Sequence, residues 1–373
     1  MSDGVVAVIV NWNGLRNTIE CLESLLHEGR PDLGIVIVDN GSDDGSVDAI
    51  KRYCADGHGE GMPVVEPAQG GRVDHIDGPA IVLLRSDTNL GYTGGNNLGM
   101  RYALEAMRPR YLLLLNNDVV VAPGLIGELL ASAEAAPGVG MWQPKVLMMR
   151  RPGTISGIGI GIRPNGQTFM IGYGEPDDGR HNVPREIFAV YGCAVLCDVR
   201  MLEEVGLFEE GFFAYYEDVE LSWRALLHGW RCMYVPTAIV HHWEGASGAS
   251  LKGMLNLRNG IYCNLKCAPA DLLMRMLMRA GLEFANFMLT ATAEGRRECL
   301  GLAWRFGLLG PVPGMLRRRS AMRTRRLETV PWLRRLMEPA SGTRQGLVAT
   351  WLTSFTSAGR AAAKGVEHAR EDA

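Results

Sequence analysis

Three carboxylates follow apolar or aromatic stretches of the chain, and each needs a partner if it is to stay charged. Asp118 ends the run YLLLLNND, Asp39 ends the run IVIVD, and Asp218 follows the aromatic segment FFAYYE. A dehydrated carboxylate is costly unless a cation or several hydrogen-bond donors meet it. These positions are therefore the first candidates for metal binding, ligand binding and proton transfer.

Asp118 is the candidate metal ligand. It follows Asn116 and Asn117 at the predicted carboxyl end of a buried strand, which is where open α/β sheets bind their ligands. Mg²⁺ or Mn²⁺ is the expected cation, because such metals combine a few carboxylates with diphosphate oxygens. Asn117 is a candidate contact to the nucleotide that carries the diphosphate. The alternative is that Asp118 forms an Asx turn capping a helix over residues 124–133.

Asp39 is the candidate nucleotide-binding acid. It ends a second buried strand and precedes the turn NGSDDGS. A carboxylate at such a strand end can accept hydrogen bonds from a nucleobase or from ribose hydroxyls. It could equally cap a helix over residues 46–53. The residue types alone leave both roles open.

The segment NLGYTGGNNLG, residues 89–99, supplies two more candidate contacts to a nucleotide, Gly91 and Asn97. Glycines let a ligand approach the backbone, and the free amides at a helix start attract phosphate. We expect a loop here, followed by a helix over residues 98–107. The spacing differs from the G-x-G-x-x-G pattern that follows the first strand of dinucleotide-binding enzymes, which argues against a dehydrogenase.

Asp218 is the candidate general base. With Glu217 it opens a predicted helix over residues 218–228, and aromatic residues precede the pair in FFAYYED. The positive end of the helix dipole would keep a carboxylate ionised there. An ionised carboxylate at the edge of a pocket can take a proton from a hydroxyl group. The alternative is an acidic first turn that only caps the helix.

Two adjacent histidines, His241 and His242, follow a strand predicted at residues 232–235. One neutral imidazole could complete a metal site. Only one of them can do so, because neighbouring residues of a strand point to opposite faces. A hydrogen-bonded surface histidine is the simpler alternative.

The elements that must position these residues alternate along the first half of the chain. Strands are predicted for the apolar, largely β-branched runs at residues 5–10, 35–38, 80–84 and 111–115. Apolar residues at helical spacing predict helices over residues 15–26 and 199–205. This alternation predicts a Rossmann-like, mostly parallel sheet with helices on both faces. Residues 55–79 lack periodicity and are interpreted as a surface insertion.

Charge divides the chain into an acidic and a basic part. Residues 1–270 hold 21 Lys and Arg against 32 Asp and Glu, whereas residues 271–373 hold 17 against 9. Apolar and Arg-rich segments alternate in the basic part, as in GMLRRR and PWLRRL, which is typical of amphipathic helices. We expect residues 269–373 to bind anionic phospholipid, and not nucleic acid. The alternative is a helical subdomain with a solvated basic face.

The compartment is predicted from the start of the chain and from its cysteines. The sequence begins MSDGVVAVIV with no basic segment before the apolar run, so we expect no signal peptide and a cytoplasmic location. The 8 cysteines show no disulfide or zinc-site spacing, and we expect reduced, buried thiols. No apolar run reaches the roughly 20 residues of a membrane span, so membrane contact would be peripheral.

Six segments, taken in order, resemble those of the bacterial family 2 glycosyltransferases, especially their rhamnosyltransferase-like branch. They are VIVNWNG, IVIVDNGSDDGS, NLGYTGGNNLG, LLLLNNDVVV, GCAVLCDVRMLEEVGLFEEGFFAYYEDVELSWRALLHGWRCMYVP and IVHHWEGAS, between residues 4 and 250. The resemblance implies a catalytic domain of GT-A fold over residues 1–268. In such a domain a nucleotide-binding half precedes an acceptor-binding half.

The resemblance also assigns roles to individual residues. It implies nucleotide contacts at Asn11 and Asp39, a metal-binding carboxylate at Asp118, a histidine metal ligand at His242 and the base at Asp218. The family's Asp-X-Asp element begins with asparagine in this sequence. Its last position, Asp118, is therefore the only carboxylate of that element that carries over.

The implied reaction is transfer of a sugar with inversion at the anomeric carbon. The expected donor is a dTDP- or UDP-linked sugar, with L-rhamnose from dTDP-rhamnose as the leading candidate. The expected acceptor is a hydroxyl of a polyprenyl-diphosphate-linked glycan, used in cell-wall or surface polysaccharide assembly at the inner face of the plasma membrane. That location gives the basic C-terminal region an anionic surface to meet.

Two other functions are compatible with such a fold. A sugar nucleotidyltransferase would need a Gly-rich, basic loop after the first strand, where NWNGLRN has one Gly and one Arg. A non-catalytic protein could keep the GT-A scaffold alone. Intact Asp118, Asp218 and His242 argue against that second alternative.

Overall fold

In a computed structural model of the protein, the chain divides into two compact units. The structure describes residues 4–58, 62–67, 75–76, 78–163, 167–244, 249–290, 296–297 and 336. The first unit comprises Met1–Ile160 and Met170–Gly245, and the second comprises Gly161–Phe169 and Ala246–Ala373. The functional division predicted at residue 268 stays a prediction.

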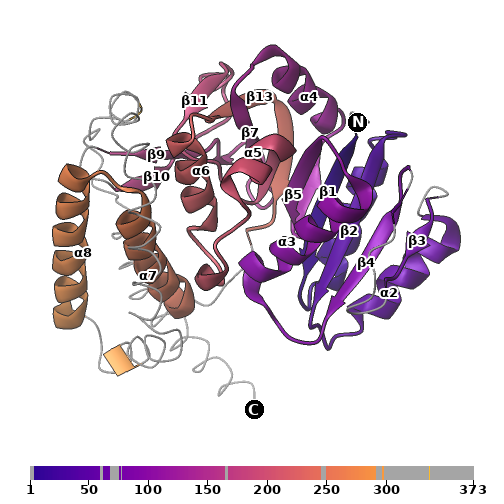
Figure 1. The fold of residues 1–373 in the computed structure, drawn as a ribbon, viewed down its shortest axis with the longest axis horizontal. Helices are drawn as coiled ribbons and strands as arrows, with labels where there is room; N and C mark the ends of the chain where they lie inside the picture. Colours follow the sequence, from indigo (N-terminus) through magenta and orange to yellow (C-terminus); the bar gives the residue numbers. More distant parts are fainter. Residues whose placement is uncertain are drawn as a thin grey trace. The chain divides into compact units, whose positions relative to one another are not determined.

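The described part of the first unit is built on an 11-stranded sheet (Figure 1). Side by side lie β11 (Arg185–Ile187), β13 (Arg231–His242), β7 (Val139–Met148), β12 (Ala194–Asp198), β5 (Tyr111–Asn116), β1 (Val5–Asn11), β2 (Leu33–Asn40), β4 (Ile81–Ser86) and β3 (Val64–Val65). In addition, β6 (Val119–Val121) pairs with β13, and β8 (Ile155–Gly157) pairs with β7.

The strands of the N-terminal half run parallel, as predicted. β1 is parallel to β2 and β5, and β4 is parallel to β2 and β3. β12 breaks this pattern, because it is antiparallel to both of its neighbours, β5 and β7. β12 therefore begins at the edge of the sheet where β1, β2 and β5 end.

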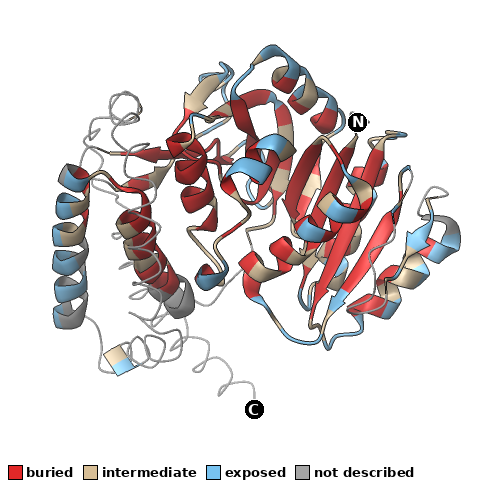
Figure 2. Ribbon diagram, viewed as in Figure 1, coloured by how far each residue is buried: buried red, intermediate tan, exposed pale blue. Residues whose placement is uncertain are grey.

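Helices cover both faces of this sheet. They are α1 (Leu15–Leu26), α2 (Ser46–Tyr53), α3 (Gly91–Tyr102), α4 (Leu125–Ala135), α5 (Val199–Val205) and α6 (Glu217–Leu227). Ile9 of β1 belongs to the same core cluster as Leu22 of α1, whereas Val8 faces Gly99 of α3. Because neighbouring strand residues point to opposite faces, α1 and α3 lie on opposite sides. Figure 2 shows the central strands buried between them.

The glycine-rich segment is helical, which corrects the predicted loop over residues 89–99. α3 begins at Gly91, and the π-helical turn η2 (Ala103–Met107) continues it. Its glycines let the helix lie close on the sheet. A Cβ atom at Gly99 would lie 2.5 Å from Cγ1 of Val8 and 2.9 Å from Cγ2 of Val38. The helix predicted over residues 98–107 covers only the second half of this element. Periodicity missed the first half because a glycine has no side chain to mark a buried face.

The strand predicted at residues 232–235 is also longer than expected, since β13 continues to His242. The prediction stopped before Pro236, because proline cannot donate to a sheet ladder. The structure absorbs this proline at an irregularity between Val235 and Ile239, where the pairing of β13 with β7 shifts register. His241 and His242 therefore lie within a strand rather than after one. The helices predicted over residues 15–26 and 199–205 are confirmed.

The insertion predicted over residues 55–79 is described only in parts. Those parts include most of the π-helical turn η1 (Cys54–His58) and the strand β3. Between residues 155 and 187 lie the short strands β8, β9 (Ile160–Ile162), β10 (Thr168–Met170) and β11. All 7 cysteines that the structure describes are buried and reduced, as predicted.

The described part of the second unit is mainly two helices, α7 (Ala249–Cys267) and α8 (Ala270–Thr290), which contact each other. Most of the basic region predicted to bind phospholipid lies outside the described residues. Within the described ranges, no helix combines the length and the apolar character needed to cross a bilayer.

We expect the Gly99→Ala variant to be less stable than the wild type. Its new methyl group would meet Val8 and Val38 below van der Waals distance, and overpacking of this kind costs about 1–3 kcal/mol. Gly127→Ala is the matched control, because a Cβ there has nothing within 4 Å and alanine favours a helix by up to about 1 kcal/mol. Thermal unfolding measures both. Equal melting temperatures for Gly99→Ala and wild type would contradict the close packing of α3.

Candidate functional site

The predicted site residues gather at the edge of the sheet where β1, β2 and β5 end. Asn11 and Asp39 are paired in the register of β1 with β2. Asp118 follows β5, and its carbonyl oxygen accepts a hydrogen bond of 3.0 Å from the N–H of Trp243. His242 pairs with the residue after Asp118 in the ladder of β13 with β6. The backbone alone therefore brings Asp118 beside His242.

A chain of hydrogen-bonded side chains joins the ends of β1, β2 and β5. The amide of Asn11 donates to Oδ1 of Asp39 at 3.0 Å and accepts from Oγ1 of Thr18 at 2.8 Å. The same Thr18 oxygen accepts from Nδ2 of Asn117 at 3.0 Å. Asn11 and Thr18 are fully buried and Asp39 is 2% exposed. This network fixes three of the predicted nucleotide contacts, Asn11, Asp39 and Asn117, to one rigid edge.

Asp39 does not cap α2, so that alternative is wrong. The first amide of the helix, on Ser46, donates instead to Oδ1 of Asp44 at 3.0 Å. The two oxygens of Asp39 accept from Asn11 and from the N–H of Ser42, at 3.0 and 3.2 Å. A carboxylate offers about four acceptor positions. Asp39 therefore keeps capacity for a ligand donor at the sheet edge.

Gly91 and Asn97 have structural partners that account for them. The φ angle of Gly91 is 74°, and a Cβ there would lie 2.4 Å from the carbonyl oxygen of Phe213. Its N–H donates to Oδ1 of Asn89 at 2.8 Å, so this amide is not free for phosphate. Asn97 is 1% exposed and exchanges hydrogen bonds of 3.0 and 3.1 Å with the backbone of Phe208. The geometry favours structural roles, and their predicted nucleotide contacts stay predictions.

Asp118 and His242 form a close pair. Nε2 of His242 lies 3.1 Å from Oδ1 of Asp118, and their side chains are 7% and 13% exposed. The other ring nitrogen of His242, Nδ1, lies 3.2 Å from the hydroxyl of Tyr191. His241 lies on the opposite face of β13, and burial lowers its pKa. The structure thus brings together the two residues predicted to bind metal.

The spacing of this pair suits a divalent cation. An octahedral ion holds its ligands at about 2.1 Å, which places neighbouring ligand atoms about 3.0 Å apart, close to the 3.1 Å between Asp118 and His242. Across the described ranges, no group of three or more His, Cys, Asp or Glu could hold a metal ion. A cation at this pair would therefore take its remaining ligands from water and from a phosphate-containing substrate.

Asp118 does not cap α4, so the Asx-turn alternative is wrong. The N–H groups of Gly124 and Ile126, at the start of that helix, donate to the carboxylate of Glu28 at 2.7 and 3.0 Å. The Asp118 carboxylate faces His242 instead.

Asp218 is held by two backbone donors. Oδ2 accepts from the N–H of Gly192 at 2.9 Å, and Oδ1 accepts from the N–H of Val219 at 2.7 Å. Burial raises the pKa of Asp218, although these two hydrogen bonds act to lower it. This corrects the expectation that the helix dipole would decide its ionisation. A raised pKa makes the carboxylate a stronger base than an exposed aspartate.

Glu217 differs from its neighbour in what its carboxyl group meets. It is 6% exposed, and its Oε2 atom has no hydrogen-bond partner among the described residues. Burial, together with the negative charge of Asp218, raises the pKa of Glu217 well above its ordinary value. The pKa of both acids is therefore raised, and Asp218 is the one whose ionised form is favoured by hydrogen bonds from the N–H groups of Gly192 and Val219.

The chain enters α6 through a strained turn of aromatic residues. Phe213, Tyr215 and Tyr216 have φ angles of 66°, 68° and 70°, which are rare for bulky side chains. Tyr216 is the N-cap residue of α6, so the interpretation of Asp218 as the helix cap is wrong. Strained backbone of this kind persists where surrounding contacts enforce it, often at functional sites.

Three residues of the site were not predicted: Thr18, Tyr191 and Gly192. Thr18 carries a hydroxyl on the apolar face of α1, and a polar residue at a core position was the available signal. Tyr191 and Gly192 precede β12, where nothing in the sequence indicates that they lie against Asp218 and His242. That contact depends on the antiparallel direction of β12.

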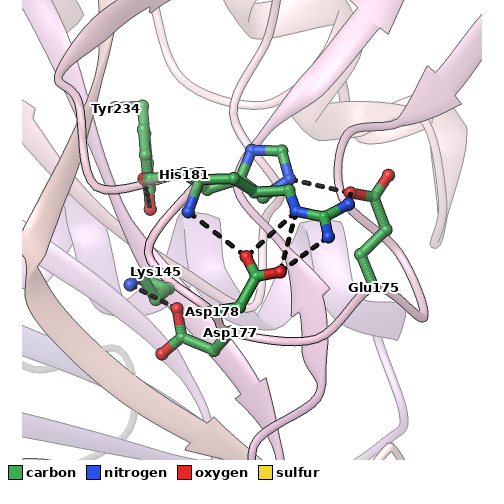
Figure 3. A network of polar contacts seen from close by, with 7 residues as sticks. Lys145, Glu175, Asp177, Asp178, His181 and Tyr234 are labelled. Carbon is green, nitrogen blue, oxygen red and sulfur yellow. Dashed lines mark hydrogen bonds and ion pairs between the residues drawn. The ribbon is translucent and has the colours of Figure 1, made fainter.

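A separate polar network anchors the loop between β10 and β11 (Figure 3). Lys145 of β7 is 3% exposed and contacts Asp177 at 2.7 Å and Asn182 at 2.6 Å. The hydroxyl of Tyr234 donates to the carbonyl oxygen of His181 at 3.0 Å. The buried lysine charge is thus neutralised by the loop, and we assign this network a structural role.

Comparison with known protein families gives one match over much of the chain. The sequence model described as Glycosyl transferase family 2 matches residues 6–204, which is more than half of the 373 residues. The matched range contains Asp39 and Asp118 and ends before Asp218 and His242.

Two curated proteins are similar to this chain. The low-salt glycan biosynthesis hexosyltransferase Agl10 of Haloferax volcanii is 29% identical over 146 residues, 39% of this chain and 46% of Agl10. The N-acetylglucosaminyl-diphospho-decaprenol L-rhamnosyltransferase of Mycobacterium tuberculosis is 26% identical over 274 residues, 66% of this chain and 79% of that enzyme. The match to Agl10 thus spans less than half of that protein.

Among solved structures, TarS of S. aureus has a similar fold. The TM-score is 0.51 at 13% sequence identity, over 89% of this chain and 55% of TarS. At this identity the similarity shows the fold alone. The predicted GT-A architecture, an α/β fold with a mostly parallel sheet and flanking helices, is confirmed.

We expect Asp118→Asn to weaken Mn²⁺ binding by at least about tenfold, because the amide removes both charge and a metal-seeking oxygen. Electron paramagnetic resonance of free Mn²⁺, in the presence of a nucleoside diphosphate, measures the affinity. Asp48→Asn is the control, since Asp48 is an exposed aspartate of α2. Equal affinities in Asp118→Asn and wild type would exclude the Asp118–His242 pair as the metal site.

Proposed function

The chain belongs to glycosyl transferase family 2, and we propose that it is a metal-dependent, inverting enzyme that transfers a sugar from a nucleotide donor to a hydroxyl of a glycan. One observation carries this proposal. The Asp118–His242 pair, with 3.1 Å between its polar atoms, and the separate carboxylate of Asp218 contact consecutive residues of the chain. The hydroxyl of Tyr191 lies 3.2 Å from Nδ1 of His242, and the N–H of Gly192 donates to Asp218 at 2.9 Å.

In the proposed mechanism, Asp218 takes the proton of the acceptor hydroxyl while the hydroxyl oxygen attacks the anomeric carbon. The Gly192 and Val219 amides hold the carboxylate in place during this transfer. Asp118 and His242 would hold the divalent cation, which supplies positive charge for the departing diphosphate. Asp39, fixed by Asn11, offers acceptor positions to the nucleobase or ribose.

Attack from the face opposite the nucleotide inverts the anomeric configuration. A retaining route through a glycosyl-enzyme would need a carboxylate nucleophile beside the donor. Glu217 is unsuited to that task, because it is buried and its pKa is raised well above the ordinary value. This favours a single displacement with Asp218 as base.

The proposed substrates come from the similarity to the mycobacterial enzyme, whose name specifies an L-rhamnosyl donor and a diphospho-decaprenol acceptor. We therefore propose dTDP-L-rhamnose as donor, with a UDP-sugar as the alternative, and a polyprenyl-diphosphate-linked acceptor. Such an acceptor would place the enzyme at the cytoplasmic face of the plasma membrane, in the assembly of a surface polysaccharide.

A donor screen with variants at the acid pair tests this function. Full-length protein, Mn²⁺ and a short polyprenyl-diphosphate-linked acceptor are combined with dTDP-rhamnose, UDP-sugars or GDP-mannose, and nucleotide release is measured. We expect acceptor-dependent release that is fastest with dTDP-rhamnose. Asp218→Asn should lower kcat by about 10²- to 10⁴-fold with unchanged donor binding. Glu217→Gln should keep most activity, because glutamine resembles the protonated acid.

The dependence on pH follows from the same pair. Since Asp218 must be ionised to act and burial raises its pKa, transfer should fall on acidification at a pH above the ordinary aspartate pKa of about 3.9. Equal losses in Asp218→Asn and Glu217→Gln would contradict the assignment of the base. Acceptor-independent release with every donor would contradict glycosyl transfer to a glycan.

An exposed apolar stripe on α8 supports contact with a membrane surface. Met274, Met278, Leu282 and Leu289 are 63%, 63%, 71% and 83% exposed, and their spacing places them on one side of the helix. The exposed Arg275 borders the stripe. Residues 271–373 hold 17 Lys and Arg against 9 Asp and Glu. An anionic lipid surface complements both the stripe and this charge.

We expect the double variant Met278→Glu, Leu282→Glu to bind vesicles of anionic phospholipid at least about tenfold more weakly than wild type, because each change places a charge in the apolar stripe. Flotation of the full chain with vesicles measures binding. Val183→Glu, at an exposed position of the first unit, is the control. Unchanged flotation of the double variant would rule out α8 as the contact.

A further inference from the structure

The segment Tyr191–Cys193 lies against both parts of the proposed site, and the mechanism above uses only the N–H of Gly192 from it. We propose that this segment is a positioning frame, in which Tyr191 orients His242 toward the metal and the N–H of Gly192 orients Asp218 toward the acceptor. This inference rests on the proposed function, since it assigns helpers to the metal ligand and to the base.

Tyr191 fixes the imidazole of His242. Its hydroxyl lies 3.2 Å from Nδ1, and the two rings meet edge to face at 5.9 Å. The same hydroxyl is hydrogen-bonded with Ser156, which donates to Glu244 at 2.7 Å. Metal-binding histidines are commonly oriented by a hydrogen bond at their second ring nitrogen, and loss of that bond weakens metal binding by about 10- to 100-fold.

Gly192 fixes the carboxylate of Asp218. Its N–H donates to Oδ2 at 2.9 Å, and its carbonyl oxygen accepts from the hydroxyl of Tyr92 at 2.6 Å. A Cβ at Gly192 would lie 3.2 Å from both Cβ and Oδ2 of Asp218. A side chain there would push the carboxylate away, so this contact explains why the position is a glycine.

The backbone of the segment is itself held on both sides. The N–H of Tyr191 donates to Oε1 of Gln143 in β7 at 2.5 Å. The carbonyl oxygen of Cys193 accepts from the N–H of Asn116, at the end of β5, at 2.8 Å. One residue earlier, the N–H of Val190 donates to the buried hydroxyl of Ser222 in α6 at 3.2 Å. His242 and Asp218 thus contact consecutive residues, Tyr191 and Gly192. These residues belong to a segment just before β12 that is held in place by its own backbone hydrogen bonds.

Two variants separate the two functions of the frame. Tyr191→Phe keeps the ring and removes the hydroxyl, so Mn²⁺ binding, measured by electron paramagnetic resonance without donor or acceptor, should weaken by about 10- to 100-fold. At saturating Mn²⁺ its pH profile should match that of wild type. Tyr173→Phe is the control, because this tyrosine is 54% exposed and its hydroxyl contacts Arg151 instead.

Gly192→Ala should give the opposite pattern. Its Mn²⁺ affinity should match wild type, while kcat falls and the acidic limb of the pH profile moves to higher pH. The sign follows because the Gly192 hydrogen bond lowers the pKa of Asp218, and the new methyl group weakens that bond. Glu217, Tyr92 and Cys193 also face Asp218, and burial raises the pKa of each, which disfavours their charged forms.

The outcomes distinguish failure of the frame from failure of the function. If Asp118→Asn loses Mn²⁺ and Tyr191→Phe binds it like wild type, the role of Tyr191 is wrong and the metal site stands. If neither variant changes Mn²⁺ binding, the metal site itself is wrong. A Gly192→Ala protein that loses stability with no shift of the pH profile would reduce Gly192 to a packing residue, and Tyr191→Phe would still test the metal half.

Discussion

The site depends on the insertion of one antiparallel strand into a parallel sheet. β1, β2 and β5 end at the same edge, and β12 begins there because it runs against β5. Strand ends of this kind leave backbone N–H and C=O groups that must find partners when buried. Here they bond to side chains and to Asn116, so the entry to β12 fastens the two halves of the site together. A strand that ran parallel to β5 at that place would end at this edge instead of beginning there.

Much of the fold follows from local signals, and the reasons for the exceptions are physical. The runs at residues 5–10 and 111–115 are buried on both faces, so their continuous apolar composition identified them. The first half of α3 was not predicted, because its close contact with the sheet requires glycines, which remove the periodic signal. β13 was predicted too short because Pro236 lies inside it. In the structure, the pairing of β13 with β7 tolerates an irregularity at this proline. In both cases tertiary packing overrode the local preference.

The candidate residues of the site were easier to predict from the sequence than the groups that hold them in place. Asp118, Asp218 and His242 stand beside apolar or aromatic runs, and such surroundings make a charged or titratable group conspicuous in a sequence. Their supports act through backbone atoms and through single hydroxyl groups, as with Gly192 and Thr18. A backbone N–H is present at nearly every residue, so its use cannot be read from residue types. The direction in which the pKa of Asp218 shifts could likewise not be predicted from the sequence, because it depends on the burial that the fold imposes.

The strained turn before α6 links the position of Asp218 to the position of α3. Phe213 keeps its unusual φ angle while its carbonyl oxygen lies where any Cβ of Gly91 would be, and it accepts the N–H of Thr93. The shape of the turn, and so the direction in which Asp218 leaves it, is moulded against α3. Gly91 of α3 and Asp218 of α6 are therefore coupled in position through this turn. A relative that lacks this glycine would need a different turn before α6.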